Sequence, residues 1–333
     1  MNEIDAPAAW QQGRAILLKG ICLESLGDQA HHIKQSSELH ADILRGTEGD
    51  ELFAAPPYSV RLEGNFEPLG SSSYEGDDQE IETIVYDAVR ADKTIAEDLW
   101  IKISWLSFYE HDESLRFRFS FGEDWAEDVA ADKMRQQHAA LLTDAIFPES
   151  RCITENAALA SVLSEILGSR QIRFVERIVY FNAPEGGAYL HHDHERGHAG
   201  VAYAQLTGDT FWLALGREQL VQEIIEFIAT CASTESWPAG ISRNARGELL
   251  ALSGDPIALV MELESFANDA LIHLINEELD FVQQLIQHGH GQYVRCGDVL
   301  LLPQENAQNC CWHSVFCVGE QTGQALSFAI RTN

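Results

Sequence analysis

Apolar and polar residues alternate along several short segments in the second half of the chain. Gly, Pro and polar residues separate these segments, and a period of two predicts strands rather than helices. We therefore expect strands at residues 172–182, 200–206, 210–215, 298–302, 313–318 and 325–331. A series of short strands with turns between them predicts a barrel or a double-sheet jelly roll.

A segment with a different period interrupts this series between Arg217 and His290. Its apolar residues recur three or four positions apart, which predicts helices. They are Leu220, Val221, Ile224, Ile225 and Ile228, followed by Leu271, Ile275, Leu279, Val282 and Ile286. We expect a helical insertion at about 217–290 that packs on the barrel or on itself. The same stripes would also suit a lid or a homodimer interface.

The first half of the chain mixes short helical and strand patterns. We expect strands at 100–105 and 115–121 around a turn at 111–114, and a polar surface loop at 70–78. Helices are predicted near 130–145 and 155–168, the second ending at Gly168. The predicted fold class is α+β, with an α/β region at 1–170 packing on a jelly-roll core at 171–333.

Charge narrows the range of partners. The 333 residues include 22 basic and 52 acidic side chains, giving a formal net charge of -30, so phosphate backbones should be repelled. No apolar run approaches the roughly 20 residues of a membrane span, and the segment Met1–Asp5 lacks the features of a secretory signal. We expect a cytoplasmic protein that binds neither nucleic acid nor membrane and acts on a small molecule or peptide.

One short motif at the end of a predicted strand carries most of the chemical information. In His191-His192-Asp193, side chains alternate between faces, so His191 and Asp193 point the same way. A distant histidine, His313 in Trp312-His313-Ser314-Val315, would add a second imidazole. Two imidazoles and one carboxylate with open positions opposite are typical of non-haem Fe(II) centres.

The other face of this motif offers a competing set. His192 and His194 also share a face, and H-x-H with a distant histidine is the ligand set of many other cupins. That set would suit Zn or Mn and reactions such as thiol oxidation or isomerisation. A histidine-rich loop without a metal is the third interpretation, and His198 fits a loop or supporting role better than that of a ligand.

Four segments together resemble a known superfamily. They are His191-x-Asp193, residues 204–213, the segment Gly297–Pro303, and Trp312–Val315. They resemble the double-stranded β-helix of 2-oxoglutarate-dependent oxygenases, with a texture similar to the cupin-like Jumonji-C branch, over residues 171–333 apart from the insertion. The resemblance implies an Fe(II)- and 2-oxoglutarate-dependent dioxygenase that hydroxylates a C–H bond, with Fe(II) bound by His191, Asp193 and His313.

The cosubstrate's far carboxylate needs a cation or hydroxyl donors inside the barrel. Jumonji-C proteins commonly place a lysine soon after a strand-turn glycine, whereas this chain has Thr210 there. Arg331 on the last strand is the preferred anchor, because alternation puts it on one face with the small residues Ala325, Ser327 and Ala329. Thr210, Tyr180 and Asn182 are further candidates for contacts with the cosubstrate.

Arg116 and Arg118 share one face of a predicted strand and are candidates for binding a substrate carboxylate, since guanidinium groups bind carboxylates with two parallel hydrogen bonds. Balancing neighbouring acidic residues is the alternative role. Two other functions stay open. One is a cupin metalloenzyme that does not use 2-oxoglutarate, and the other is a non-catalytic acidic protein that binds a partner.

Overall fold

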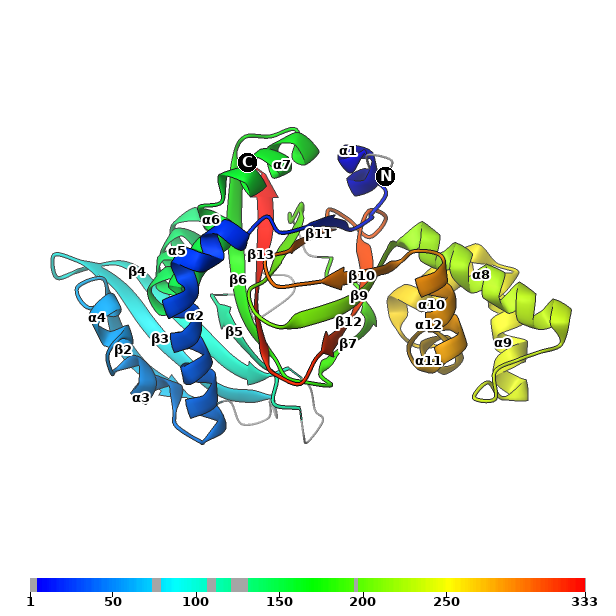
Figure 1. Ribbon diagram of the computed structural model, residues 1–333, viewed down its shortest axis with the longest axis horizontal. Helices are drawn as coiled ribbons and strands as arrows, with labels where there is room; N and C mark the ends of the chain where they lie inside the picture. The colour runs from blue at the N-terminus through cyan, green and yellow to red at the C-terminus, as the bar shows by residue number, and fades with distance from the viewer. Residues whose placement is uncertain (1–4, 74–78, 107–111, 121–130, 195–196, 333) are drawn as a thin grey trace.

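The computed structural model describes residues 5–73, 79–106, 112–120, 131–194 and 197–332. It combines helices with two antiparallel sheets (Figure 1). The larger sheet contains, in spatial order, β1 (Ile16–Leu18), β11 (Val299–Pro303), β8 (Gly200–Gln205), β13 (Gly323–Thr332), β6 (Ile172–Asn182), β5 (Leu115–Phe119), β4 (Lys93–Trp105), β3 (Glu80–Arg90) and β2 (Phe66–Ser72). The smaller contains β10 (Gly291–Val294), β9 (Asp209–Gly216), β12 (Cys311–Val318) and β7 (Gly187–His191).

From β6 onward the chain passes back and forth between the two sheets. Strands β6, β8, β11 and β13 are neighbours in the larger sheet, and β7, β9, β10 and β12 form the smaller one. A buried cluster that includes Tyr203, Trp212, Leu300 and Ala325 draws on strands of both sheets. All six strands expected in this half are present, although their ends differ by a few residues.

Helices cover the face of the larger sheet that points away from the smaller sheet, and they enclose the main apolar core. They include α1 (Ala6–Gln11), α2 (Leu23–Leu44), α5 (Lys133–Ile146), α6 (Arg151–Thr154) and α7 (Ala157–Leu167). Along β13, Leu326, Phe328 and Ile330 belong to this core, whereas Ala325 belongs to the cluster between the sheets. The predicted alternation along β13 is therefore confirmed. Gly168 ends α7 in the left-handed conformation, as expected.

The N-terminal half departs from expectation in its strands. Strands β2 to β5 continue the larger sheet beyond β6, and two short helices, α3 (Gly49–Phe53) and α4 (Tyr58–Leu62), precede them. The surface loop expected at 70–78 is wrong at its start, because a register shift at Pro68/Gly70 lets β2 continue pairing with β3 as far as Ser72.

Parts of several expectations lie outside the described residues. These are loop residues 74–78, turn residue His111, strand residue Phe121 and helix residue Ala130. Within the described part, β5 begins at Leu115 and α5 begins after its cap Asp132. The division into regions at residues 170/171 stays a prediction.

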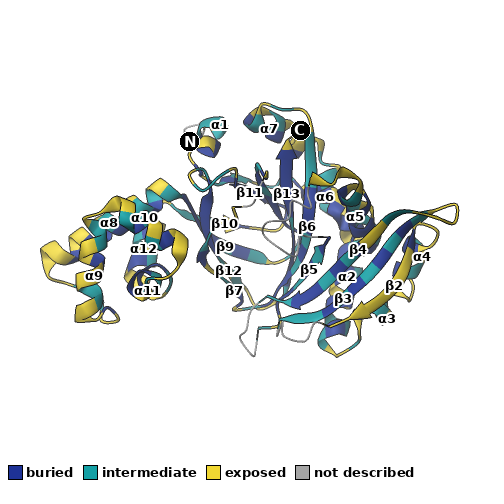
Figure 2. Cartoon of the chain, turned by 180° about the vertical axis from the view of Figure 1, so that it is seen from behind, coloured by how far each residue is buried: buried dark blue, intermediate teal, exposed yellow. Residues whose placement is uncertain are grey.

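Five helices lie between β9 and β10: α8 (Arg217–Thr234), α9 (Arg243–Ser253), α10 (Pro256–Ser265), α11 (Asp269–Glu277) and α12 (Leu279–Gln287). They project from the smaller sheet, away from α2 and α5 (Figures 1 and 2), and share an apolar cluster with Leu190, Leu213 and Trp312 of that sheet. The second apolar stripe is not one helix, because Glu278 is extended and leaves Leu279 79% exposed. No helix of the described residues is long and apolar enough to span a membrane.

Candidate metal centre

The pairing of β7 with β12 brings two histidines together. His191 is the last residue of β7 and is the register partner of His313 on β12. Their neighbours Leu190 and Trp312 face the insertion helices, so by alternation both imidazoles face the space between the sheets. The ring centroids of His191 and His313 are 4.4 Å apart.

Asp193 follows β7 by two residues and lies between these imidazoles. Its Oδ1 is 3.4 Å from His191 Nε2, and its Oδ2 is 3.3 Å from His313 Nε2. One ligand atom from each of the three residues lies within 4.8 Å of the other two. Strand pairing thus assembles the three side chains that the sequence singled out, with the carboxylate facing both rings.

Backbone carbonyls orient both rings in the same way. His191 Nδ1 lies 2.6 Å from the carbonyl oxygen of Tyr189, and His313 Nδ1 lies 3.1 Å from that of Cys311. A carbonyl only accepts hydrogen bonds, so each Nδ1 carries a proton and each Nε2 has its lone pair free when the ring is neutral. This is the arrangement that histidine ligands of metal ions use, with the far ring nitrogen fixed by a hydrogen bond.

The ionised carboxylate of Asp193 favours the binding of a cation at this site. Desolvation opposes ionisation of Asp193, but hydrogen bonds from His191 and His313 more than offset it and hold the pKa of the carboxyl well below its usual range. Desolvation lowers the pKa of His191, but the hydrogen bond and the charge of Asp193 outweigh desolvation and raise this pKa above its ordinary value. The His313 side chain is 4% exposed and that of Asp193 50%, so the centre is accessible from the Asp193 side.

The competing histidines do not converge with His313. The His192 ring packs against Trp312, with centroids 4.8 Å apart, on the side of the insertion helices. His194 is exposed, and its backbone N–H donates to His192 Nδ1. Among the described residues, neither belongs to a group able to bind a metal. His198 is buried, its Nε2 lies 2.5 Å from Glu176 Oε2, and it is not part of the convergent group.

Arg331 lies beside the loop that carries Asp193. It is buried, and a Cβ atom added to Gly197 would lie only 2.8 Å from Arg331 Nη2. Gly197 also has a φ of +78°, a conformation that residues with side chains rarely adopt. The glycine therefore lets the loop after Asp193 approach the guanidinium group closely.

The other predicted cosubstrate contacts lie at the opposite end of β13. Asn182 pairs with Gly323 and Tyr180 with Ala325, whereas Arg331 pairs with Arg173. Ala325 and Arg331 are six positions apart along the strand, or about 20 Å. One small cosubstrate cannot contact both ends.

A neutral hydrogen-bond network fills the Asn182 end. Asn182 Nδ2 donates to the Tyr203 hydroxyl at 3.0 Å, and the Thr210 hydroxyl contacts Gln205 Oε1 at 3.0 Å. The Trp212 indole N–H donates to Thr210 Oγ1 at 2.9 Å. These polar atoms satisfy one another, so Thr210 and Asn182 stabilise the interior as it stands.

The predicted substrate-binding arginines lie on the β5 side of the larger sheet. Arg116 pairs with Tyr180 and Arg118 with Ile178, while Phe117 between them faces the main core. Both arginines are half-buried, and Arg116 Nε donates to Ser104 Oγ at 3.0 Å. They therefore share the sheet face that continues into the space between the two sheets.

The sequence did not indicate two residues that contact the predicted site residues. Trp212 stacks on His313, with centroids 5.4 Å apart and an interplanar angle of 28°, and Gly197 accommodates Arg331. Alternation puts Trp212 on one face of β9 with Thr210 and Ala214, but no sequence pattern marks its contact with a residue about 100 positions away. Gly197 lies four residues after Asp193, and a glycine there was the available signal.

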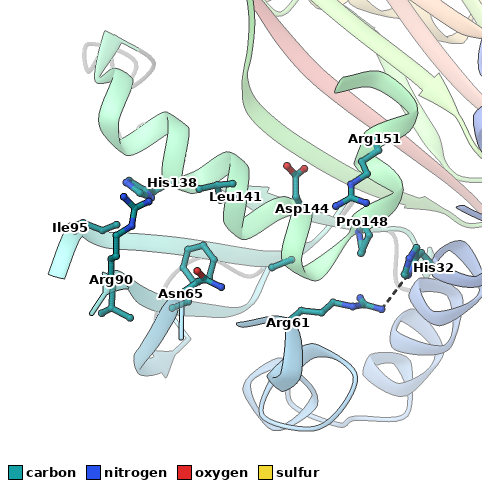
Figure 3. A pocket seen from close by; sticks show the side chains of 13 residues that line it. His32, Arg61, Asn65, Arg90, Ile95, His138, Leu141, Asp144, Pro148 and Arg151 are labelled. Atoms are coloured by element: carbon teal, nitrogen blue, oxygen red, sulfur yellow. Dashed lines mark hydrogen bonds between the residues drawn. The ribbon is translucent and has the colours of Figure 1, made fainter. Parts of the chain in front are cut away.

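A separate hollow of about 470 Å³ lies among the N-terminal helices and strands (Figure 3). Arg61 and Arg151 extend into it from α4 and α6, and α5 contributes Asp144, beside Arg151, and His138. Its lining includes none of the three convergent residues, so it is distinct from the candidate metal centre.

No protein-family model matches the chain, and the curated proteins include no match. Similar solved structures include a 2OG-Fe(II) oxygenase family oxidoreductase from Burkholderia pseudomallei, at 8% identity over 66% of this chain and 69% of that one, with a TM-score of 0.29. Two structures of the Escherichia coli ribosomal oxygenase YcfD match all of this chain at 10% and 12% identity, with TM-scores of 0.30 and 0.29. The chain covers 52% of the YcfD chains. The first of these neighbours is described as a 2OG-Fe(II) oxygenase family protein and the other two as ribosomal oxygenases.

Proposed function

We propose that this protein is an Fe(II)- and 2-oxoglutarate-dependent oxygenase that hydroxylates a small molecule or a peptide. The observation that carries the proposal is the convergence of His191 Nε2, His313 Nε2 and an Asp193 carboxylate oxygen within 4.8 Å of one another. Two imidazoles and one carboxylate leave coordination positions open for other ligands, which is the arrangement of non-haem Fe(II) oxygenases. The metal would supply the site at which O2 is activated.

The three residues fit such an ion without a change of tautomer. The carbonyl oxygens hold His191 and His313 at Nδ1, so a cation that displaces the proton from each Nε2 finds that atom already directed at the centre. Asp193 stays ionised and supplies the negative charge that a divalent cation needs. In the absence of a cation, the imidazoles donate to the carboxylate and hold the same geometry.

We also propose that the eight strands from β6 to β13 form a double-stranded β-helix. Its two sheets would be β11-β8-β13-β6 and β10-β9-β12-β7, in that spatial order. In this arrangement, helices α8 to α12 are inserted in the connection between β9 and β10 of the double-stranded β-helix. The N-terminal strands β2 to β5 would widen the larger sheet and supply the substrate-binding face.

Arg331 is the proposed anchor for the far carboxylate of 2-oxoglutarate. It is buried, it lies beside Gly197 near the Asp193 loop, and its inward neighbours on β13 are small. A buried guanidinium group binds a carboxylate strongly, because water competes little for the hydrogen bonds between them. Thr210, Tyr180 and Asn182, at the far end of β13, would shape the floor of the cavity rather than contact the cosubstrate.

The substrate would approach from the exposed side of Asp193, with Arg116 and Arg118 binding an anionic group on it. Replacing both arginines by Met should leave substrate-independent consumption of 2-oxoglutarate unchanged and reduce the substrate-stimulated rate. A panel of small acids and peptides, tested with free and with esterified carboxylates, would show whether that group is recognised.

The test of the proposed function is succinate formation from 2-oxoglutarate under air by protein loaded anaerobically with Fe(II). Asp193→Ala should abolish it, and Arg331→Met should require at least 10-fold more 2-oxoglutarate. Arg295→Met, which removes a charge from the surface near Tyr293, serves as the matched control. Succinate formation that persists in Asp193→Ala would overturn the proposal.

A second candidate is a cupin metalloenzyme that does not use 2-oxoglutarate. The neutral network of Tyr203, Gln205, Thr210 and Trp212 favours it, because this network fills the interior beneath His313 without a cation. This candidate predicts tight metal binding that Arg331→Met leaves unchanged, and no effect of 2-oxoglutarate on the metal's spectrum.

A further inference from the structure

A second group of ligand-type side chains lies at the base of the insertion helices. Glu223 and Glu226 are one turn apart on α8, and His288 and His290 flank Gly289 between α12 and β10. One ligand atom each from Glu223, Glu226 and His288 lies within 4.8 Å of the other two. His290 Nε2 lies 3.0 Å from Glu223 Oε1.

Both histidines point at the Glu223 carboxylate. His288 Nδ1 lies 2.8 Å from Glu223 Oε2, and Gln284 Nε2 donates to the same oxygen at 2.7 Å. Glu223 is 7% exposed, so three groups from one segment, residues 284–290, meet at a nearly buried carboxylate of α8. Glu226 is exposed beside it and accepts from Gln222 Nε2 at 2.6 Å.

We propose that Glu223, Glu226, His288 and His290 form a binding site for a divalent transition-metal cation, Zn(II) in the first instance. Two imidazoles and two carboxylates are enough for the closed four-coordinate site of a structural zinc. The carboxylates, one turn apart on α8, meet His288 from the turn before β10, and His290 from the same turn contacts Glu223. Binding would displace the protons that the histidines share with Glu223.

The position of the site indicates its role. The chain leaves the smaller sheet at Gly216, where α8 begins, and returns at Gly291, the start of β10, which pairs with Leu213 of β9. The backbone N–H of Ala214 also donates to the carbonyl of His290. A cation between α8 and the residues before β10 would therefore tie together the exit and the return of the insertion helices and fix them on the sheet that carries His313.

The experiment measures Zn(II) binding by the full chain in an Asp193→Ala background, which removes the other candidate metal group. Calorimetric titration should show one Zn(II) per chain, and Co(II) in its place should give the intense visible bands of a four-coordinate site. Adding His288→Gln and His290→Gln should weaken binding at least 10-fold. His273→Gln is the matched control, because His273 lies between two glutamates of the same insertion, Glu277 and Glu278, at 2.9 Å from each.

A third variant separates the loss of a metal ligand from the loss of folding. Glu226 is exposed, so Glu226→Gln should fold normally and still weaken Zn(II) binding. Zn(II) should also slow proteolysis within α8 to α12 in the parent protein but not in this variant. Absence of Zn(II) binding in the Asp193→Ala protein, or binding unaffected by Glu226→Gln and by the two histidine changes, would overturn the proposal. Neither result bears on Fe(II) at His191, Asp193 and His313.

Discussion

Gly197 lies directly against the guanidinium group of Arg331, in a backbone conformation that favours glycine. The contact joins the loop that carries Asp193 to the last strand of the larger sheet. It explains how an arginine 18 positions beyond His313 in the sequence comes to lie near the Asp193 loop. The first prediction tests this relationship.

Gly197→Ala should weaken 2-oxoglutarate binding several-fold and leave the Fe(II) stoichiometry unchanged. The new Cβ would lie 2.8 Å from Arg331 Nη2, so the arginine must move, and a positive φ adds about 1 kcal/mol of strain. Calorimetric titration of 2-oxoglutarate and a thermal unfolding curve measure the two effects. Gly254→Ala, in which the added Cβ has only ordinary contacts, is the control. Equal affinities in both variants would show that Arg331 does not hold the cosubstrate.

His191→Ala and His192→Ala should separate the two ligand assignments. Loss of His191 should lower Fe(II) affinity by more than roughly 100-fold, since even outer partners of metal ligands contribute 10- to 100-fold. Loss of His192 should leave the metal bound and cost about 1 kcal/mol of stability, because its ring packs on Trp312. Metal analysis after dialysis distinguishes them, and the reverse pattern would favour the His192/His194 set.

Trp212 supports His313 from beneath and can be tested by two substitutions. Trp212→Phe keeps an aromatic ring under His313 but removes the donor to Thr210, so we expect a loss of about 1 kcal/mol and unchanged metal affinity. Trp212→Ala should cost about 3–5 kcal/mol and weaken metal binding as well. Denaturant unfolding and Fe(II) titration provide both readings. Metal affinity that is insensitive to Trp212→Ala would mean that the stack does not position His313.

Glu149 should make stability depend on pH. It is fully buried, and its Oε1 accepts hydrogen bonds from the Ser36 hydroxyl and from Gln324 Nε2, the latter at 2.6 Å. Burial is the largest influence and raises the pKa of this carboxyl above 4.5, its ordinary value. The folded state therefore binds the proton more tightly, and stability is lost as pH rises from 4.5 through the folded-state pKa.

Glu149→Gln removes this titration while its amide oxygen still accepts both hydrogen bonds. We expect a gain of about 1 kcal/mol or more in the free energy of unfolding at pH 8, and no gain near pH 4.5. Urea unfolding at the two pH values measures it. An equal change at both would show that the charge of Glu149 is not the cause.

Sequence patterns predicted that an apolar strand ends at the His191 motif and that another strand covers 313–318. Leu190 and His191 on β7, and Trp312 and His313 on β12, face opposite sides, as a period of two requires. The pairing of His191 with His313 is a long-range relationship, so the sequence indicated the residues but not their register. The carbonyls of Tyr189 and Cys311 that fix the tautomers are backbone groups and leave no mark in the sequence.

Other elements escaped prediction for identifiable physical reasons. Strand β2 contains Pro68 and Gly70, residues that normally argue against a strand, and a register shift accommodates them. The stripe from Leu271 to Ile286 keeps a helical period across a break at Glu278, so periodicity alone could not separate α11 from α12. Glu223 and His288 are 65 positions apart and meet only through the packing of α8 on α12.

The most direct test of the central claim is an anaerobic titration of 2-oxoglutarate into the Fe(II)-loaded protein, followed by visible absorption. Chelation of Fe(II) by a 2-oxo acid produces a charge-transfer band without O2 or substrate. We predict that the band saturates at one equivalent, is absent in Asp193→Ala, and requires at least 10-fold more 2-oxoglutarate in Arg331→Met. Protein that retains Fe(II) but shows no band at saturating 2-oxoglutarate would contradict the account.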